Sequence, residues 1–551
     1  MKRKLTIFLI PVALLAFLSQ NSFSQQSTIT RQYTPVSFKV GELPFAGQVI
    51  DSLVMYRYIS TDGWQAIPYQ FDEFNAANGR YEPEDGIADS DDEILVMPTD
   101  LGEKASGEFA PEEGVLERWE IEVSETGTDQ KGWVYFFKKT GNEAPVEGYM
   151  SYAADTQGAG ADTVRGASYS ESHNPNNGWI ADISIRQNGV LGPDIIDTQK
   201  LRVQGNALFI GQIEANEADN VAYDSVKVTV GPLRVFRRLY FRIIAPGALG
   251  SLIDPIPADI EFQYFPYSSI VSAKNATISE EIANVAGIKL IRQSLDLSPA
   301  AAGMKFYSDS NTDGVDIDGV NDAGVNTSIP VTPDIAFLTA NGDPGMLLNI
   351  FKVPTLGNSQ QLYYYEDGSG SGTTGDGTKD TGDQSSYGDF GIQINGEKIS
   401  GQVSLDFLTY FLEKQDDPVA ASNQIRDNSS TPLTVTAVYE VDTPSSIADG
   451  SQLPGQFILH DAHPNPFLPS SEAMTISFEL ASPANNLSVT IYNLLGQEVA
   501  RIAEGQRFQA GAHTLRWNGR NQFGTPVPAG VYFYALEGRT GRQVKKVLIV
   551  R

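Results

Sequence analysis

The most specific chemical pattern in the sequence is a run of oxygen-bearing side chains near residue 310. Its members are Asp309, Asn311, Asp313, Asp316 and Asp318. The first three stand at alternate positions and Gly314 follows them, as in loops that wrap a calcium ion and turn sharply at their sixth residue. Val320 replaces the glutamate that closes an EF-hand loop, so the later aspartates, Asp322 included, would have to complete a different geometry. We predict a structural calcium site here. The alternative is a turn held by its own side-chain hydrogen bonds.

A second acidic group lies earlier in the chain, directly before the apolar stretch 94–97. Its members are Asp85, Asp89, Asp91 and Glu93. Carboxylates this close together repel one another unless a cation or solvent screens them. The group therefore predicts a second calcium site, and the alternative is a solvated turn.

Histidine adds little further chemistry. Of the four histidines, His460, His463 and His513 lie beyond residue 456, so only His173 remains for the rest of the chain. That count excludes a zinc site built from several histidines. The turn-forming residues 174–178 after His173 predict an exposed loop histidine rather than a catalytic one. Neither a Gly-x-Ser-x-Gly nucleophile motif nor a phosphate-binding loop occurs.

Carboxylates and tyrosines leave an enzymatic function open. Glycoside cleavage needs two carboxylates at a set separation across a cleft, and a tyrosine can serve as the base of a lyase. The acidic residues are too numerous for the sequence to select such a pair. The three tyrosines at 363–365 are predicted to be strand residues, partly in the core.

Composition and the N-terminal residues restrict where the protein acts. The 551 residues include 39 basic and 68 acidic side chains, a net charge of −29, and no cysteine. This charge disfavours nucleic acid and anionic membranes as partners, and the lack of cysteine excludes disulfides and thiolate chemistry. Residues 1–24 have the basic start, apolar run and small residues of a signal peptide. No later stretch is apolar enough to span a bilayer, so we predict an exported protein without a transmembrane span.

Residues 25–441 have the pattern of one large β-rich region, expected to form two packed sandwiches or one supersandwich. Valines alternate with polar residues over 226–230, and residues 133–137 form a short aromatic and β-branched run. The spacing of apolar residues over 405–412 suits either a helix or a buried strand. Residues 367–389 are rich in Gly, Ser, Thr and Asp, which predicts a long exposed loop or a disordered insertion.

A linker over 442–455 separates this region from a smaller domain at 456–551. The smaller domain has nine basic and six acidic residues, so its net charge of +3 leaves −32 for the preceding chain. Period-two alternation recurs at Ile476–Leu480, Leu487–Ile491, Leu515–Trp517, Val531–Ala535 and Val547–Ile549. Short strands at this spacing predict an Ig-like β-sandwich, and the fold class of the whole chain is all-β.

The small domain also carries motifs in a recognisable order. They include Pro464, Asn465 and Pro466 at its start, Gly496 and Val499 in the middle, Pro528, Gly530 and Tyr532 near the end, and Lys545 and Lys546 in the last strand. In these motifs the domain resembles the C-terminal sorting domain of type IX secretion. Residues 517–520 are similar to the related Ig-like domain of flagellar hook-capping proteins. The resemblance implies delivery across the outer membrane by the type IX secretion machinery, to the cell surface or the medium.

The function of the large region is less defined. Residues 67–101, in which a strand meets the pair Asp72 and Glu73, are faintly similar to uncharacterised exported β-sandwich proteins associated with polysaccharide use. Because every motif with a built-in mechanism is absent, we expect a non-catalytic module that binds glycan or another surface polymer. The alternative is a polysaccharide-degrading glycosidase or lyase.

Overall fold

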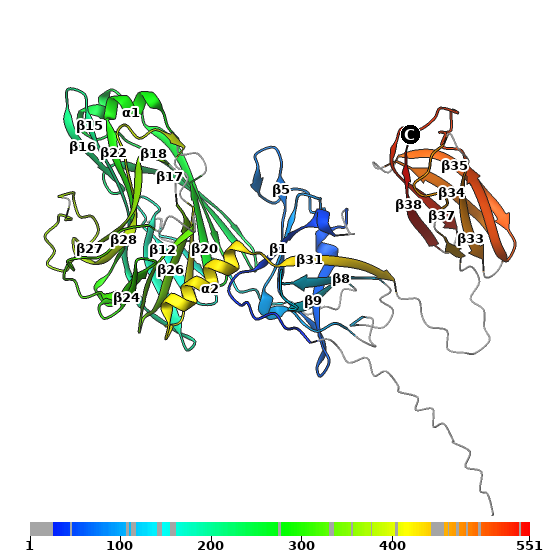
Figure 1. The fold of residues 1–551 in the computed structure, drawn as a ribbon, viewed down its shortest axis with the longest axis horizontal. Coiled ribbons are helices and arrows are strands. Elements are labelled where there is room, and N and C mark those ends of the chain that lie inside the picture. The colour runs from blue at the N-terminus through cyan, green and yellow to red at the C-terminus, as the bar shows by residue number, and fades with distance from the viewer. Residues whose placement is uncertain are drawn as a thin grey trace, which may run out of the picture. The chain divides into compact units, whose positions relative to one another are not determined.

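The computed structural model describes residues 26–43, 47–105, 110–111, 117–139, 146–154, 161–273, 277–329, 335–353, 356–375, 377–402, 406–441, 457–460, 462–469, 473–480, 483–493, 497–538 and 541–550. The predicted signal peptide and the predicted linker lie outside these residues. The chain divides into two compact units, Met1–Thr443 and Pro444–Arg551. Strands dominate both units, which confirms the all-β class (Figure 1).

The first unit begins with a small sandwich of two antiparallel sheets. One sheet has three strands in the order β1-β7-β4, and the other has five in the order β3-β2-β9-β8-β31. The bounds are β1 Val36–Lys39, β2 Leu53–Ile59, β3 Gly63–Ala66, β4 Tyr69–Asp72, β7 Glu93–Val96, β8 Glu117–Ser124, β9 Lys131–Lys138 and β31 Thr434–Val441; a hairpin of β5 Phe74–Asn75 and β6 Arg80–Tyr81 extends from it. The residues of β9 are apolar in succession because both faces of this strand are covered.

A larger sandwich follows, made of one sheet of nine strands and two sheets of five. The nine-stranded sheet has the order β17-β18-β19-β20-β30-β26-β25-β23-β24. Its bounds are β17 Val221–Val230, β18 Val235–Ile243, β19 Ile256–Tyr264, β20 Ser268–Ala273, β23 Lys305–Ser308, β24 Asn311–Asp316, β25 Ile335–Gly342, β26 Gly345–Lys352 and β30 Phe407–Leu412. Apolar side chains from all three sheets form one continuous core.

The two five-stranded sheets carry most of the polar chemistry of the unit. The first runs in the order β10-β11-β12-β13-β14, and the second, called the β15 sheet below, in the order β16-β15-β22-β28-β27. Their bounds are β10 Ser151–Ala153, β11 Thr163–Arg165, β12 Tyr169–His173, β13 Ile180–Gln187, β14 Val190–Asp194, β15 Ile196–Ala207, β16 Gly211–Asn216, β22 Ile288–Leu297, β27 Ser359–Asp367 and β28 Ser386–Asn395; β21 Thr277–Ile278 pairs with β29 Gly401–Gln402. Of the tyrosines at 363–365, which lie on β27, Tyr364 is buried.

Helices are few in the described part of the chain. They are α1 Glu280–Ala286, α2 Pro418–Ser430 and short 3₁₀ turns at Val40–Glu42, Ile50–Ser52, Pro98–Asp100, Gly247–Ser251 and Pro299–Ala301. None of these described helices has the length and apolar character that crossing a membrane requires. Helix α2 begins after Asp417, whose carboxylate accepts a hydrogen bond from Ala420 N at 2.9 Å. In the stretch 405–412, whose spacing suits either a helix or a buried strand, Phe407–Leu412 form the strand β30, which is buried on both faces.

One buried arginine fixes the small sandwich to the large one. Arg234, directly before β18, forms ion pairs with Asp72 on β4 and with Glu93 on β7, the latter at 2.6 Å. The side chain of Gln70 accepts hydrogen bonds from the backbone N–H groups of Leu233 and Arg234 at 2.8 and 2.7 Å. Burial raises the pKa of Asp72, against the opposing effect of Arg234. Removing one partner of such a pair would leave an uncompensated buried charge, at a cost of about 3–5 kcal/mol.

The prediction of an exposed loop over 367–389 is only partly right, because several residues of the segment are buried while 382–384 are exposed. Thr374, Thr378, Asp380 and Thr381 are buried, and β28 already begins at Ser386. Most of these polar side chains form hydrogen bonds and ion pairs with side chains on the outer face of the β15 sheet. A polar segment can therefore be buried here. Gly382 has a φ of +83°, and a Cβ there would lie 1.7 Å from a carboxylate oxygen of Asp197, so the tight approach requires glycine.

The second unit is a sandwich of a three-stranded sheet, β32-β33-β36, and a four-stranded sheet, β35-β34-β37-β38. The bounds are β32 Phe457–Leu459, β33 Met474–Leu480, β34 Ala484–Tyr492, β35 Glu498–Phe508, β36 Gly511–Trp517, β37 Gly530–Gly538 and β38 Gly541–Ile549. The predicted alternation is confirmed on β33 and β38, where Ile476, Phe478, Val547 and Ile549 are buried. On β37 the phase is the opposite of the predicted one, because Tyr532, Tyr534 and Leu536 occupy the core.

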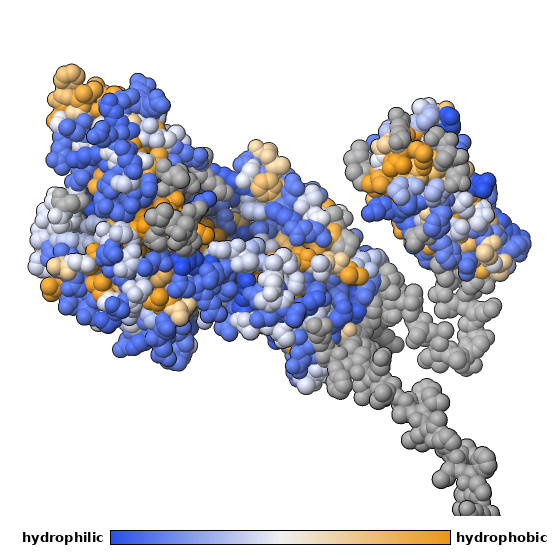
Figure 2. Space-filling model, viewed as in Figure 1, coloured by the Kyte–Doolittle hydropathy of each residue, from blue (hydrophilic) through white to orange (hydrophobic). Residues whose placement is uncertain are grey.

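The surface is mostly hydrophilic, as expected for the high net charge (Figure 2). One partly buried carboxyl group, that of Asp197, makes the stability of the fold depend on pH. Asp197 accepts hydrogen bonds from Asp383 N at 3.1 Å, and burial, with the nearby Asp383 and Asp380, raises its pKa from 3.8 to about 6. The folded state thus binds this proton more tightly than the unfolded state. No penalty arises below the unfolded pKa, and stability falls as the pH rises from about 4 to about 6.

We expect Asp197→Asn to remove this loss of stability. The free energy of unfolding of the variant, measured with urea, should exceed that of the wild type at pH 7 and approach it at pH 4. Asp427→Asn, at an exposed aspartate, is the control for the loss of a surface carboxylate. A difference between Asp197→Asn and wild type that is the same at both pH values would contradict this assignment.

Candidate functional site

One pocket of the first unit lies where the N-terminal segment, α2 and the small sandwich meet. Its volume is about 390 Å³, enough for one or two sugar rings. It is called the amide pocket here because side-chain amides dominate its polar wall. The lining residues are Thr30, Arg31, Gln32, Tyr33, Glu125, Gln130, Leu412, Gln415, Ala421, Gln424, Ile425 and Asn428.

Helix α2 provides one wall of the pocket through residues on a single face. Ala421, Gln424, Ile425 and Asn428 are spaced three and four apart, which places them above one another on a helix. Ile425 is buried against the apolar cluster under α2, so it holds the helix in place. Gln424 is exposed, and Asn428 is partly exposed on the same face.

The opposite wall is fixed by one arginine. Arg31 forms an ion pair with Glu125 at 2.6 Å, and both side chains are nearly buried. The same guanidinium donates hydrogen bonds to the carbonyl oxygens of Asn428 at 2.9 Å and Thr431 at 2.6 Å, at the C-terminal end of α2. A cation there compensates the unpaired carbonyls and the helix dipole. Because Arg31 and Glu125 neutralise each other, the pocket has no excess charge, although the chain is strongly acidic.

Several amides in the pocket remain available to a ligand. The side chains of Gln32, Gln424 and Asn428 make no hydrogen bond to any other described residue. Each amide offers a carbonyl acceptor and an N–H donor, which suits the paired hydroxyls of a neutral sugar better than a phosphate or carboxylate. Tyr33, whose ring packs edge-to-face on Tyr267 at 5.5 Å, adds an aromatic surface.

The groups needed for glycan cleavage are not assembled in this pocket. Glu125 is the one carboxylate among the lining residues, and it is held by Arg31. Hydrolysis of a glycosidic bond needs a second carboxyl group across the substrate. Burial and the charge of Glu413 raise the pKa of Tyr33, so its hydroxyl is a poor base at neutral pH. Asp72 and Glu73 do not supply the pair, because Asp72 is bound to Arg234 and Glu73 accepts hydrogen bonds from the backbone at residues 85 and 86.

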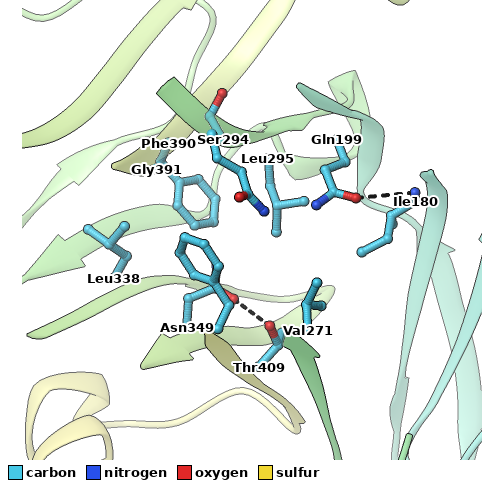
Figure 3. Close-up of a pocket in the computed structure, with 12 residues that line it drawn as sticks. Ile180, Gln199, Val271, Ser294, Leu295, Leu338, Asn349, Phe390, Gly391 and Thr409 are labelled. Carbon is cyan, nitrogen blue, oxygen red and sulfur yellow. Dashed lines mark hydrogen bonds between the residues drawn. The ribbon is translucent and has the colours of Figure 1, made fainter. Parts of the chain in front are cut away.

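A second void lies between the sheets of the large sandwich (Figure 3). Its volume is about 30 Å³, the space of one water molecule. Apolar side chains such as Leu338, Phe390 and Phe407 form much of its wall, and Asn349 there accepts a hydrogen bond from Thr409 at 2.7 Å. This void is a packing defect of the core rather than a ligand site.

The prediction of an exposed His173 is wrong. His173 is the last residue of β12 and is 1% exposed. Its ring lies 3.0 Å from a carboxylate oxygen of Asp162 and 2.8 Å from the hydroxyl of Tyr264, which donates to Glu171 at 2.6 Å. Hydrogen bonds and ion pairs to His173 and Arg237 hold the pKa of Asp162 well below its usual value, although burial opposes this. The turn-forming residues begin one position later, and a group this buried does not reach substrate.

The first predicted calcium ligands are not gathered around one point. Asp309 forms an ion pair with Arg426 at 2.6 Å, and Asp316 pairs with Lys305 across the β23–β24 hairpin. Asn311 donates to Ser308 at 2.8 Å, Asp318 accepts from Val320 N at 2.9 Å, and Asp313 is exposed on β24. The segment is thus a strand of a hairpin followed by a turn, not an EF-hand-like loop.

The second predicted group is also dispersed. Glu93 on β7 pairs with Arg234, which lowers the pKa of Glu93 although burial opposes this, while Asp85, Asp89 and Asp91 are exposed. Across the described ranges, no set of three or more acidic or histidine side chains is arranged to hold a metal ion. Calcium binding stays a prediction from the sequence pattern.

The predicted sorting motifs connect the first and last segments of the second unit. Asn465, between Pro464 and Pro466, accepts a hydrogen bond from Leu548 N at 3.0 Å and donates to the carbonyl of Lys546 at 3.3 Å. Phe467 N donates to the carbonyl of Leu548 at 2.7 Å. The entry motif is therefore bound to β38, the strand that carries Lys545 and Lys546.

The remaining motif residues lie in the second sheet. Val499 is on β35, and Gly530 and Tyr532 are on β37. The hydroxyl of Tyr532 donates to the carbonyl of Pro528 at 3.1 Å, which holds the turn before β37. Gly496 lies outside the described residues.

Sequence reasoning did not identify the amide pocket. Single glutamines and asparagines carry no specific pattern, and their grouping depends on contacts between segments about 100 to 400 positions apart, such as those of Arg31. The available signal was the spacing of residues 421, 424, 425 and 428, which follows one face of a helix.

Comparison with known proteins gives a partial assignment. Residues 467–542 match the FlgD Ig-like domain family. No curated protein sequence matches the chain. Among solved structures, the chain is similar to a polysaccharide lyase, with a TM-score of 0.23 and 9% identity, over 70% of this chain and 46% of the lyase. It is also similar to PorZ of Porphyromonas gingivalis, a surface component of the type IX secretion system, with a TM-score of 0.13 and 12% identity, over 73% of this chain and 51% of PorZ.

The chain thus spans about half the length of these two structures. Superpositions this loose assign neither the fold nor a function. The family match, together with the two-sheet sandwich of the second unit, shows an Ig-like domain at the C-terminal end of the chain.

Proposed function

We propose that this chain is an exported surface protein whose first unit binds a neutral glycan through the amide pocket. The observation that carries the proposal is a pocket of about 390 Å³ whose polar wall is made of amides and hydroxyls around one neutralised ion pair. Such a wall matches sugar hydroxyls and offers no second carboxylate for cleavage. The role is therefore binding without chemistry.

The proposal includes delivery by the second unit. An Ig-like domain at the C-terminal end, with its entry motif hydrogen-bonded to the final strand, supports a sorting role in which type IX secretion machinery recognises the folded domain. The lack of cysteine is compatible with an exported protein that relies on packing and buried ion pairs.

The pocket is tested by a glycan array with the wild type and the double variant Gln424→Ala, Asn428→Ala. Each lost hydrogen bond contributes about 1 kcal/mol, so binding should weaken by about tenfold or more. Asp427→Ala is the matched control, because it is exposed on the same helix but does not line the pocket. Binding that is equal in all three proteins would place the glycan elsewhere, and release of reducing ends from a bound polymer would show an enzyme instead.

The sorting role is tested by removing residues 456–551. The shortened protein should accumulate in the periplasm instead of reaching the surface or the medium, as measured by cell fractionation. The double pocket variant should be exported as the wild type is, because its second unit is unchanged. Normal surface levels of the shortened protein would exclude a sorting function of the Ig-like domain.

We also propose calcium as a structural ion of the first unit, on the sequence pattern at 309–318. A chelator should then lower the melting temperature, and added calcium should restore it by mass action on the folded state. Asp313→Ala, at an exposed position, should abolish this response. If added calcium does not change the melting temperature of metal-free protein, the calcium proposal is wrong. The segment 309–318 is then held only by its own contacts, such as the ion pairs to Lys305 and Arg426.

A further inference from the structure

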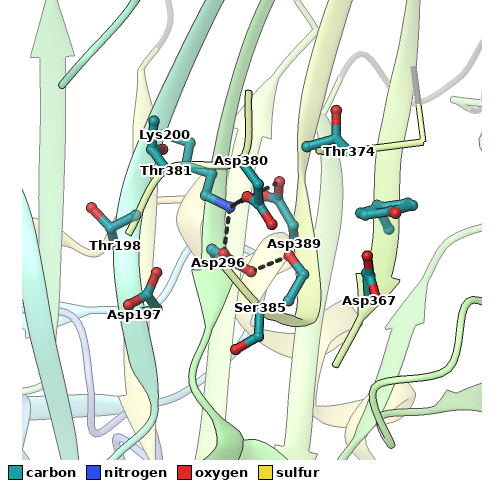
Figure 4. Close-up of polar contacts among 12 residues, drawn as sticks. Asp197, Thr198, Lys200, Asp296, Asp367, Thr374, Asp380, Thr381, Ser385 and Asp389 are labelled. Atoms are coloured by element: carbon teal, nitrogen blue, oxygen red, sulfur yellow. Dashed lines mark hydrogen bonds and ion pairs between the residues drawn. The ribbon is translucent and has the colours of Figure 1, made fainter. Parts of the chain in front are cut away.

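A buried lysine on the β15 sheet lies among three carboxyl groups. Lys200 on β15 contacts carboxylate oxygens of Asp296 on β22 and of Asp380 in the segment before β28 (Figure 4). An oxygen of Asp389, on β28, lies 3.9 Å from the same nitrogen. All four residues are at most 2% exposed. Amine and carboxyl groups are therefore held together without bulk water.

The strand register explains this arrangement. Lys200 pairs with Ser294 and Thr198 pairs with Asp296, so Lys200 and Asp296 are diagonal neighbours on one face of the sheet. Leu295 pairs with Phe390, which places Asp296 beside Asp389 on the next strand. The sheet thus places three groups on adjacent strands: the amine of Lys200, the carboxyl carbon of Asp296 that this amine can attack, and the carboxyl group of Asp389.

The hydrogen bonding of the three carboxyl groups is unequal. Asp296 accepts a hydrogen bond from the hydroxyl of Ser386 at 2.6 Å through the oxygen that does not contact Lys200. Neither oxygen of Asp389, nor the second oxygen of Asp380, has a hydrogen-bond partner among the described residues. Three carboxylates beside one ammonium would leave excess negative charge in a dry site, which is costly unless a carboxyl group is protonated. Burial raises the pKa of Asp296 well above its usual value, in agreement with this.

We propose that Lys200 and Asp296 condense to an isopeptide bond, with Asp389 transferring the proton. The Nζ–Cγ bond forms and the Cγ–OH bond of protonated Asp296 breaks. Of the three ammonium protons, one passes to Asp389, one leaves with the hydroxyl as water and one stays on the amide nitrogen. The reaction balances without an oxidant or cofactor.

Two physical factors favour condensation at this site. Reacting groups fixed in contact have effective concentrations of about 10⁵ M or more, which offsets the unfavourable equilibrium of amide formation in water. The water molecule that the condensation releases leaves the site. Because bulk solvent does not enter the site, little water is present there to hydrolyse the new bond. The bond would join β15 to β22 across 96 positions of the sequence, in a chain whose lack of cysteine excludes a disulfide. The inference is independent of the glycan and sorting proposals.

Mass spectrometry of the folded, purified protein tests the bond directly. The intact mass under denaturing conditions should be lower than the sequence mass by one water molecule. A tryptic digest should contain one branched peptide that joins Lys200 to Asp296. Lys305 and Asp316 form an exposed ion pair and are the internal control, so their peptides should be linear.

Variants separate the roles of the three residues. Lys200→Arg keeps the positive charge but should restore the full sequence mass. Asp389→Asn keeps the shape of the catalytic carboxyl group and should leave most molecules uncondensed. Full mass and linear peptides in the folded wild-type protein would overturn the proposal, and so would a branch at Asp380 in place of Asp296.

Discussion

The first unit depends on one constraint. Its buried charged side chains must pair with oppositely charged side chains from other parts of the sequence. Arg237 and Arg238 on β18 are each 1% exposed. Arg237 pairs with Asp162 at 2.7 Å, and Arg238 pairs with Glu261 at 2.7 Å and with Glu82 at 2.9 Å. Such pairs add little net stability, but breaking one leaves a buried charge and costs about 3–5 kcal/mol. These ion pairs therefore specify which arrangement of the segments forms, and they add little to the stability of that arrangement.

The β15 sheet shows the consequence for loops. One face of this sheet is apolar and belongs to the shared core, whereas the other carries Lys200 and Arg202. Arg202 pairs with Glu217 at 2.7 Å and donates to the carbonyl of Lys379 at 2.8 Å. A polar segment must therefore cover this face, and a segment rich in small hydroxyl residues can approach closely enough to do so. Gly382 permits the closest part of that approach.

The sequence predicts what depends on local periodicity and does not predict what depends on distant partners. Alternation over 476–480 placed Ile476 and Phe478 in the core, because a strand with one covered face has a strict period of two. The same rule was ambiguous for β30, which is covered on both faces. The polar neighbours of His173 and the polar composition of 367–389 predict a surface position for both. Their partners, such as Tyr264 and Lys200, lie 91 and 180 positions away, and no local pattern reports them.

The position of the amide pocket follows from the path of the chain. After completing β30, the chain forms α2 and then returns to the small sandwich as β31, which pairs with β8. Arg31 joins the end of α2 to Glu125, which follows β8, so the pocket walls belong to both sandwiches. A ligand that contacts both α2 and the N-terminal segment must bind the state in which the two sandwiches are aligned. By mass action such a ligand would stabilise the folded first unit as a whole, because its binding site exists only when both sandwiches are in place.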